Sequence, residues 1–238
     1  MLQTIKISKQ PDGKPEIFYS IQGEGYHLGR PATFVRLAYC NLRCVWCDSK
    51  YTWDWKGKNP EEYFVEMNID EAERAVAAPG CHHVVFTGGE PLVQQKSLTV
   101  LLERLKAKDY YIEVETNGSL LPLGSLAGMV DHWSVSPKLE NSGNPRSVRE
   151  VPECYQFFQH ILSVHFKFVI DAPDDIIEVN NLVAKYGIRR ERVYLMPAAD
   201  NELTLKQKSV WLVEKCKENG YSFSTRLQIT LWGNERGR

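Results

Sequence analysis

The sequence predicts an α/β fold in which buried parallel strands alternate with helices. Short apolar runs recur along the 238 residues, and longer segments with apolar residues three and four positions apart lie between several of them. The short runs are typical of buried strands, and the longer spacing is typical of helices that cover a sheet. This alternation favours parallel strands joined by right-handed crossovers, and hence an α/β sheet or barrel.

Six runs are expected to form strands and four segments to form helices. The strands are residues 33–37, 84–86, 112–115, 132–135, 166–170 and 193–195. The helices are residues 70–78, 97–106, 173–186 and 204–218. Asp70, Ser97 and Thr204 are expected N-caps, because their side-chain oxygens can accept hydrogen bonds from the free N–H groups of a first helical turn.

Bulk properties narrow the class of protein. The length fits a single domain, residues 1–238, that is large enough to bury a core. The net charge is −1, with 29 Lys and Arg against 30 Asp and Glu, so there is no basic surplus for nucleic acid. The first residues lack the apolar stretch of a signal peptide, and no run approaches membrane-spanning length. Six cysteines in such a chain indicate reduced thiols or ligands, so we expect a cytoplasmic protein with no nucleic-acid or membrane partner.

Polar or glycine-rich residues directly follow every predicted strand. The six continuations are three cysteines, residues 87–91, residues 115–118, residues 136–138, Asp171 and residues 196–197. Because parallel strands end at the same edge of a sheet or barrel, these residues are expected to meet there. The sequence therefore predicts a ligand site at the carboxyl edge.

The three cysteines after the first strand carry the strongest chemical signal. Cys40, Cys44 and Cys47 stand in the spacing Cys-x3-Cys-x2-Cys. A tetrahedral zinc site or an ordinary iron–sulfur cluster takes four ligands, and no suitably spaced Cys or His pair follows. Three thiolates favour a cluster with one open iron, which is a catalytic arrangement. A structural zinc site or three incidental thiols is the alternative.

Together with Thr87-Gly88-Gly89-Glu90-Pro91, the cysteine motif resembles that of the radical S-adenosylmethionine (SAM) enzymes. In that superfamily three cysteines hold a [4Fe–4S] cluster, and SAM chelates its fourth iron. The resemblance implies a partial (β/α)6-type barrel, open or modified from the TIM barrel, with the cluster in the loop after its first strand. The SAM contacts that it implies are Gly89, Glu115, Ser136, Pro137 and Lys138.

Further motifs narrow the resemblance to the 7-carboxy-7-deazaguanine synthase family. These are Gln22-Gly23-Glu24-Gly25, the strand that carries Arg36, Cys47-Asp48, residues 115–118 and residues 136–138, in that family's order. The match runs from about residue 18 to residue 138 and continues more loosely to Trp232-Gly233-Asn234. It implies ring contraction of 6-carboxy-5,6,7,8-tetrahydropterin to 7-carboxy-7-deazaguanine with release of ammonia, on the route to queuosine and other 7-deazapurines. SAM is regenerated in that reaction, and Mg²⁺ assists.

The resemblance also implies a substrate site and a magnesium ligand. The implied pterin contacts are Ile21, Gln22, Gly23, Glu24, Arg36 and Thr87, with Arg36 pairing with the substrate carboxylate. Ser49 occupies the position of a hydroxyl ligand to Mg²⁺, for which a helix or turn cap is the alternative. A homodimer and an external electron donor of the flavodoxin or ferredoxin kind are implied as well.

Two other functions stay open on the sequence alone. A glycyl-radical-enzyme activase of the radical SAM superfamily shares the length, the cysteine spacing and the Gly-Gly-Glu-Pro element, but acts on a protein. A non-enzymatic zinc- or iron–sulfur-binding module would hold a metal centre and catalyse nothing. Residues 18–49 comprise the expected substrate turn and cluster loop, and residues 50–69 are an insertion without an assigned role. Residues 227–232 are expected to form a last strand or a dimer contact.

Overall fold

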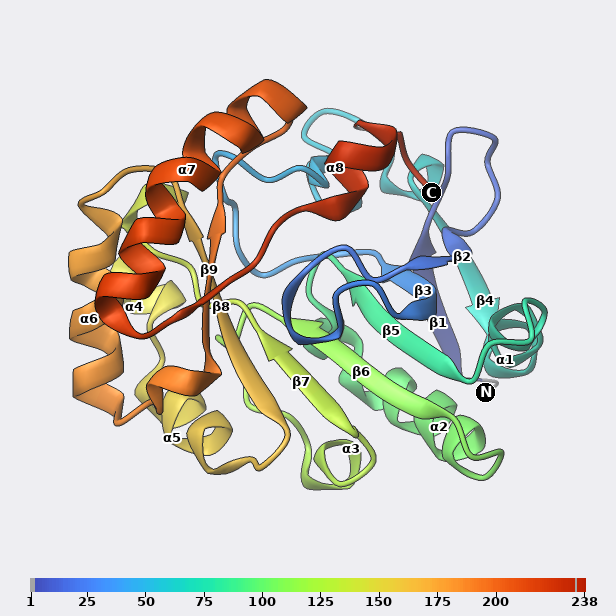
Figure 1. Ribbon diagram of the computed structural model, residues 1–238. Helices are drawn as coiled ribbons and strands as arrows, with labels where there is room; N and C mark the ends of the chain where they lie inside the picture. The colour runs from blue at the N-terminus through green and yellow to red at the C-terminus, as the bar shows by residue number, and fades with distance from the viewer. Residues whose placement is uncertain (1–2, 234) are drawn as a thin grey trace.

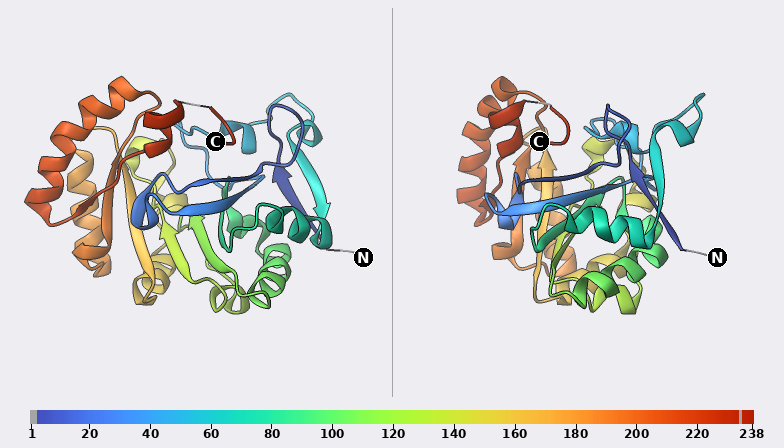
Figure 2. Two further views of the ribbon diagram at one scale, coloured as in Figure 1. Left: turned by 45° about the vertical axis from the view of Figure 1, so that its right-hand side comes forward. Right: turned by 90° about the vertical axis from the view of Figure 1, so that its right-hand side faces the viewer.

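The computed structural model describes residues 3–233 and 235–238, and shows a curved mixed sheet with helices along its convex side (Figures 1 and 2). The strands are β1 (Thr4–Ser8), β2 (Ile17–Ile21), β3 (Pro31–Leu37), β4 (Phe64–Asn68), β5 (His83–Gly88), β6 (Tyr111–Thr116), β7 (His132–Val135), β8 (Val164–Ile170), β9 (Val193–Pro197) and β10 (Ser222–Phe223). Their order is β10-β9-β8-β7-β6-β5-β3-β1-β4, with β2 paired to β3 outside this path. Within the described residues the two edge strands do not pair, so the sheet is an open, partial barrel. Met1, Leu2 and Asn234, the last residue of the family match, lie outside the described residues.

The parallel part of the sheet contains all six predicted strands. Strand β3 pairs in parallel with β5, and the parallel pairing continues in order through β10. Strand β7 has the predicted bounds, and the other five are longer by one or two residues at one or both ends. The expected α/β class and partial barrel are therefore confirmed.

Three antiparallel strands at one side of the sheet were not predicted. Strand β2 pairs with β3, and β4 pairs with β1 from Thr4 opposite Asn68 to Ser8 opposite Phe64. The insertion 50–69 supplies β4, and its Trp55 packs with Phe64 against Ala38. The insertion thus extends the sheet and supports the chain just before the first cysteine.

The helices include all four that the periodicity predicts. They are α1 (Ile69–Ala77), α2 (Gln95–Lys106), α3 (Gly124–Ala127), α4 (Arg146–Arg149), α5 (Pro152–His160), α6 (Asp175–Tyr186), α7 (Glu202–Asn219) and α8 (Leu227–Trp232). The expectation of a last strand at residues 227–232 was wrong, because α8 lies there and β10 already fills the sheet edge beside β9. Within the described residues, no helix is both long and apolar enough to span a membrane.

The three expected N-caps were also wrong, because the helices begin earlier. Asn68 caps α1 in a capping box with Glu71, and Asn201 caps α7 by accepting from the Thr204 N–H. Helix α2 continues directly from a 3-10 turn, Pro91–Gln94, so Ser97 lies inside it. An Asn two or three residues upstream offers the same acceptor oxygen as the expected cap, and local sequence does not decide between them.

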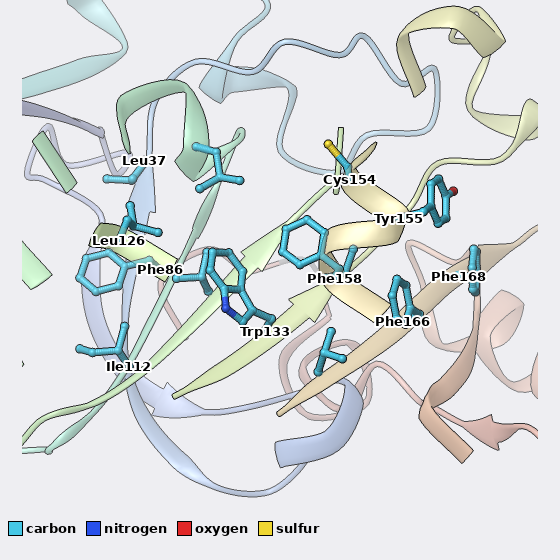
Figure 3. Packing of buried hydrophobic residues seen from close by; sticks show 14 of the residues in the cluster. Leu37, Phe86, Ile112, Leu126, Trp133, Cys154, Tyr155, Phe158, Phe166 and Phe168 are labelled. Atoms are coloured by element: carbon cyan, nitrogen blue, oxygen red, sulfur yellow. The ribbon is translucent and has the colours of Figure 1, made fainter. Parts of the chain in front are cut away.

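The two faces of the barrel sheet differ in polarity. Side chains that alternate along β6 illustrate this: Ile112 and Val114 join the main apolar core, whereas Glu113 and Glu115 face the barrel interior. The core lies between the sheet and the helices, where Trp133, Phe158 and Phe166 are fully buried (Figure 3). Apolar packing therefore holds the helices outside and leaves the interior face free for polar groups.

Candidate active site

A cavity of about 900 Å³ lies at the carboxyl ends of the parallel strands. It is lined by every predicted site residue except Pro137: Ile21, Gln22, Gly23, Glu24, Arg36, Cys40, Cys44, Cys47, Ser49, Thr87, Gly89, Glu115, Ser136 and Lys138. The structure thus brings the expected cluster, SAM, magnesium and substrate residues to one site, as the rule for strand carboxyl ends predicts.

The cysteine loop leaves β3 through a residue in an unusual conformation. Tyr39 has a φ of 72°, which is uncommon for a residue with a side chain. Its N–H donates to the Thr52 carbonyl and its carbonyl accepts from the Glu90 N–H, both at 2.8 Å. These two bonds hold the turn that carries the chain from β3 to Cys40.

The sulfur atoms receive N–H donors, as cluster thiolates in proteins do. The Leu42 N–H lies 3.4 Å from the Cys40 sulfur, Asn144 Nδ2 lies 3.2 Å from that of Cys44, and Trp53 Nε1 lies 3.4 Å from that of Cys47. Burial raises the pKa of the Cys40 thiol to about 12 and also raises that of Cys44. A metal that replaces the protons would remove this cost, so the donor set fits a three-cysteine iron–sulfur cluster.

Gly88 and Gly89 are required by the neighbouring backbone. A Cβ on Gly88 would lie 2.2 Å from the Leu37 carbonyl oxygen, and one on Gly89 would lie 1.9 Å from that of Tyr39. The glycines thus let the β5 end pack on the start of the cysteine loop, which is a structural reason for them in addition to the implied SAM contact of Gly89. The next residue, Glu90, is fully buried and accepts from the Thr116 hydroxyl and the Asn117 N–H.

Glu115 connects residues predicted to bind different molecules. Its carboxylate accepts from Gln22 Nε2 at 3.1 Å and from the Thr87 hydroxyl at 2.8 Å. Gln22 in turn accepts from the Glu24 N–H at 3.2 Å. The expected SAM contact Glu115 and the expected substrate contacts Gln22 and Thr87 therefore form one hydrogen-bonded group.

Glu24 is held by three side chains that were not predicted. Lys167 of β8 contacts one carboxylate oxygen, while Arg226 at 3.0 Å and Gln228 at 2.6 Å contact the other. Although burial opposes ionisation, Lys167 and Arg226 hold the pKa of Glu24 well below its usual range. Arg226 also contacts Asp48, which follows Cys47 directly, so a charged network joins the substrate turn to the cluster loop.

The remaining predicted residues have defined surroundings. Arg36 donates through Nε to Glu16 at 2.9 Å, and Glu16 also accepts from Arg236 and the Tyr51 hydroxyl. The Gly23 carbonyl accepts from the Leu227 N–H at 3.0 Å. In a separate group, Lys138 donates to the Ser136 hydroxyl at 2.8 Å, and its ammonium lies 5.7 Å from the centre of the Trp46 ring.

Ser49 starts a 3-10 turn, Lys50–Thr52, but its hydroxyl makes no capping bond. The hydroxyl lies 3.7 Å from the Cys47 sulfur, and the residue is buried at the cavity wall. The alternative role of a turn cap therefore does not describe this side chain.

The sequence analysis missed four residues that complete the site, and only one of them could have been recognised from its local sequence. Lys167 is the only ordinarily charged side chain in the buried run Val164–Ile170, and such a residue needs a partner. No local pattern marks the other three residues, Glu16, Arg226 and Gln228, because they come to the cavity from distant segments of the chain.

Comparison with known proteins places these features in a family. Residues 35–203 match the radical SAM superfamily. The 7-carboxy-7-deazaguanine synthase of Pyrobaculum aerophilum is 41% identical over 227 residues, which cover 94% of this chain and 96% of that protein. The protein of that name from Rhodopirellula baltica is 33% identical, over 93% of this chain and 87% of its own. The crystal structure of QueE from Escherichia coli shares the fold with a TM-score of 0.71, at 23% identity over 94% of each chain.

Proposed function

The chain belongs to the 7-carboxy-7-deazaguanine synthase family of radical SAM enzymes, and on that premise we propose that it converts 6-carboxy-5,6,7,8-tetrahydropterin to 7-carboxy-7-deazaguanine with release of ammonia. One observation carries the proposal: the Gln22–Glu115–Thr87 group lines the same cavity as the three cysteines. The two alternatives from the sequence, an activase and a non-catalytic module, lose their support because the family match covers nearly the whole chain.

The cysteine loop is the part of the chain that would hold the [4Fe–4S] cluster which the family implies. When bound, the cluster and SAM would supply the radical chemistry. The protein limits access to that centre. Trp46 is held by a hydrogen bond from its Nε1 to Asn141 at 3.1 Å, and its ring lies beside Lys138 at the cavity wall.

For SAM, we propose contacts with Gly89, Glu115, Ser136 and Lys138, and an indirect role for Pro137. Lys138 lines the cavity as a cation and suits a carboxylate, while Glu115 suits ribose hydroxyls. Pro137 does not line the cavity, so its part is to direct Ser136 and Lys138 toward it.

For the pterin, we propose contacts with Ile21, Gln22, Gly23, Glu24, Arg36 and Thr87. An ionised carboxylate has about four acceptor sites, and three protein donors occupy those of Glu24, so about one is free for an N–H group of the pterin. Arg36 uses its Nε for Glu16 and has four further N–H donors for a substrate carboxylate. These groups orient the substrate and form hydrogen bonds with its polar edges, and they transfer no protons themselves.

Four finer points complete the proposal. Ser49 would supply one oxygen to Mg²⁺, which usually keeps few protein ligands and takes substrate oxygens and water for the rest. The electron would come from an external flavodoxin- or ferredoxin-like donor, and the chain would act as a homodimer of single-domain subunits. A reducing, cytoplasmic location would suit the thiols, all six of which are free.

Anaerobic reconstitution tests the proposed reaction. The full chain is supplied with iron, sulfide, SAM, Mg²⁺, a reductant and 6-carboxy-5,6,7,8-tetrahydropterin, and the product is measured by mass spectrometry. We expect 7-carboxy-7-deazaguanine from the wild type and from Cys81→Ala, a partly exposed cysteine away from the cavity, and none from Cys44→Ala. Release of 5′-deoxyadenosine with the pterin unchanged would reject the substrate and keep the superfamily.

A further inference from the structure

A second polar cluster lies on the interior face of the barrel, near the amino ends of the strands. It is formed by His83 of β5, Glu113 of β6 and His27, which ends a 3-10 turn, Gly25–His27, in the loop between β2 and β3. None of the three lines the active-site cavity. In Figure 1 this loop lies in front of β6 and β7, where it covers the interior face.

The three side chains converge on one point. His27 Nδ1 lies 2.8 Å and His83 Nε2 lies 3.1 Å from the same carboxylate oxygen, Oε2 of Glu113. All three atoms lie within 4.8 Å of one another. Donor atoms about 2.1 Å from a tetrahedral metal ion are about 3.4 Å apart, so small side-chain shifts would bring this set to coordination distance.

The charge of Glu113 calls for a cation. The carboxylate is 1% exposed, and within residues 3–233 and 235–238 only imidazoles pair with it. Glu24, by contrast, has both a Lys and an Arg. A buried carboxylate that lacks a cationic partner is costly unless a bound cation or a protonated imidazole neutralises it.

We propose that His27, His83 and Glu113 bind a divalent transition-metal ion, for which Zn²⁺ is the best-matched species. Two imidazoles and one carboxylate are a common donor set for zinc, and hard ions such as Mg²⁺ prefer all-oxygen sites. The set leaves a fourth position for water. His132 does not fill it, because its two ring nitrogens pair with Ser163 and His165.

The surroundings suit both binding and entry of the ion. The other nitrogen of His27 lies 3.5 Å from the Tyr111 hydroxyl, which can orient the ring. The other nitrogen of His83 has no hydrogen-bond partner within the described part of the chain, so the ring can change tautomer without losing a bond there. The His27 side chain is 9% exposed, which places the solvent route on its side of the cluster.

Zinc binding by a full-length chain without cluster cysteines tests this proposal. In the variant C40A/C44A/C47A, Zn²⁺ cannot occupy the cysteine loop. We expect equilibrium dialysis to give one Zn²⁺ per chain. The affinity for Zn²⁺ should fall at least tenfold when any one of His27→Ala, His83→Ala or Glu113→Gln is added to this variant. His82→Ala is the matched control, because His82 is the exposed neighbour of His83 and should bind as before.

A spectroscopic measurement covers variants that fold poorly. The parent protein is the folded variant C40A/C44A/C47A. Co²⁺ bound to it should show the visible absorption bands of nitrogen and oxygen coordination, and one equivalent of Zn²⁺ should remove them. Absence of stoichiometric Zn²⁺ binding by the parent would overturn the proposal and leave a protonated imidazole as the partner of Glu113. Binding that all three ligand variants retain would overturn it as well.

Discussion

Two carboxylates on the interior face of β6 lie two residues apart and have opposite surroundings. Glu115 accepts from an amide and a hydroxyl and faces the active-site cavity. Glu113 accepts from two imidazoles and is closed off from that cavity. The same strand face thus carries a site that is open to ligands at its carboxyl end and, toward its amino end, a polar cluster that is separate from the cavity. In a parallel barrel, position along the strand decides which carboxylate meets substrate.

The largest expected difference is in turnover. Glu115→Gln removes the charge that faces the cavity but keeps the side-chain size, so we expect product formation to fall about 100-fold, or ~3 kcal/mol in transition-state stabilisation. The free energy of unfolding should change by less than about 1 kcal/mol, because the two hydrogen-bond donors to this carboxylate, Gln22 and Thr87, are neutral. Steady-state kinetics and urea unfolding measure the two effects. A large loss of stability with turnover retained would mean that Glu115, like Glu113, serves the structure of the barrel interior and not the active site.

Strand β8 sharpens the comparison, because Lys167 faces the cavity while His165, two residues earlier, hydrogen-bonds His132. Lys167→Met leaves Glu24 buried with one cation fewer, and we expect a loss of about 3 kcal/mol of folding free energy at pH 7. Burial opposes ionisation of both groups, but their attraction keeps the pKa of Glu24 lowered and that of Lys167 raised.

The sign of both pKa shifts sets the pH dependence of that loss. The contribution of Glu24 is present above its unfolded pKa of about 4.3 and is lost as the pH falls through the folded value. The contribution of Lys167 is present below about 10.4 and is lost as the pH rises through its higher folded value. Urea unfolding should therefore show a constant difference between wild type and Lys167→Met from about pH 5 to 9, shrinking in stronger acid. A difference that persists unchanged in strong acid would show that packing, not charge, causes the loss.

The smallest expected effect concerns the hydroxyl of Ser49. Ser49→Ala removes one proposed oxygen ligand, so we expect the Mg²⁺ concentration for half-maximal turnover to rise about tenfold, or ~1.4 kcal/mol. Stability should stay within about 0.5 kcal/mol, because the hydroxyl makes no capping bond. Titration of activity with Mg²⁺ measures the shift, and Ser49→Thr, which keeps the hydroxyl, is the control. Equal Mg²⁺ dependence in all three proteins would remove Ser49 as a ligand.

Part of the interior could have been predicted from the strands themselves. Polar residues recur every second position in runs that are otherwise apolar, as in His132 and Ser134 of β7, or His165 and Lys167 of β8. Period-two polarity in a parallel strand indicates a polar inner face. Among the short antiparallel strands, β1 does alternate polar and apolar residues, but this five-residue run was not recognised as a strand. It pairs with β4 only after the chain has folded back.

Local sequence predicted six of the parallel strands, four of the helices, the cysteine loop after the first parallel strand, and the motifs at the carboxyl ends. These features follow from local periodicity and from spacing within a few residues. Which charged side chains pair with one another depends on the tertiary fold. Glu24 pairs with Lys167 and Arg226, which lie 143 and 202 positions away, and His27 reaches Glu113 across 86 positions. No local pattern encodes such pairs, because their partners come from separate elements that the fold alone brings together.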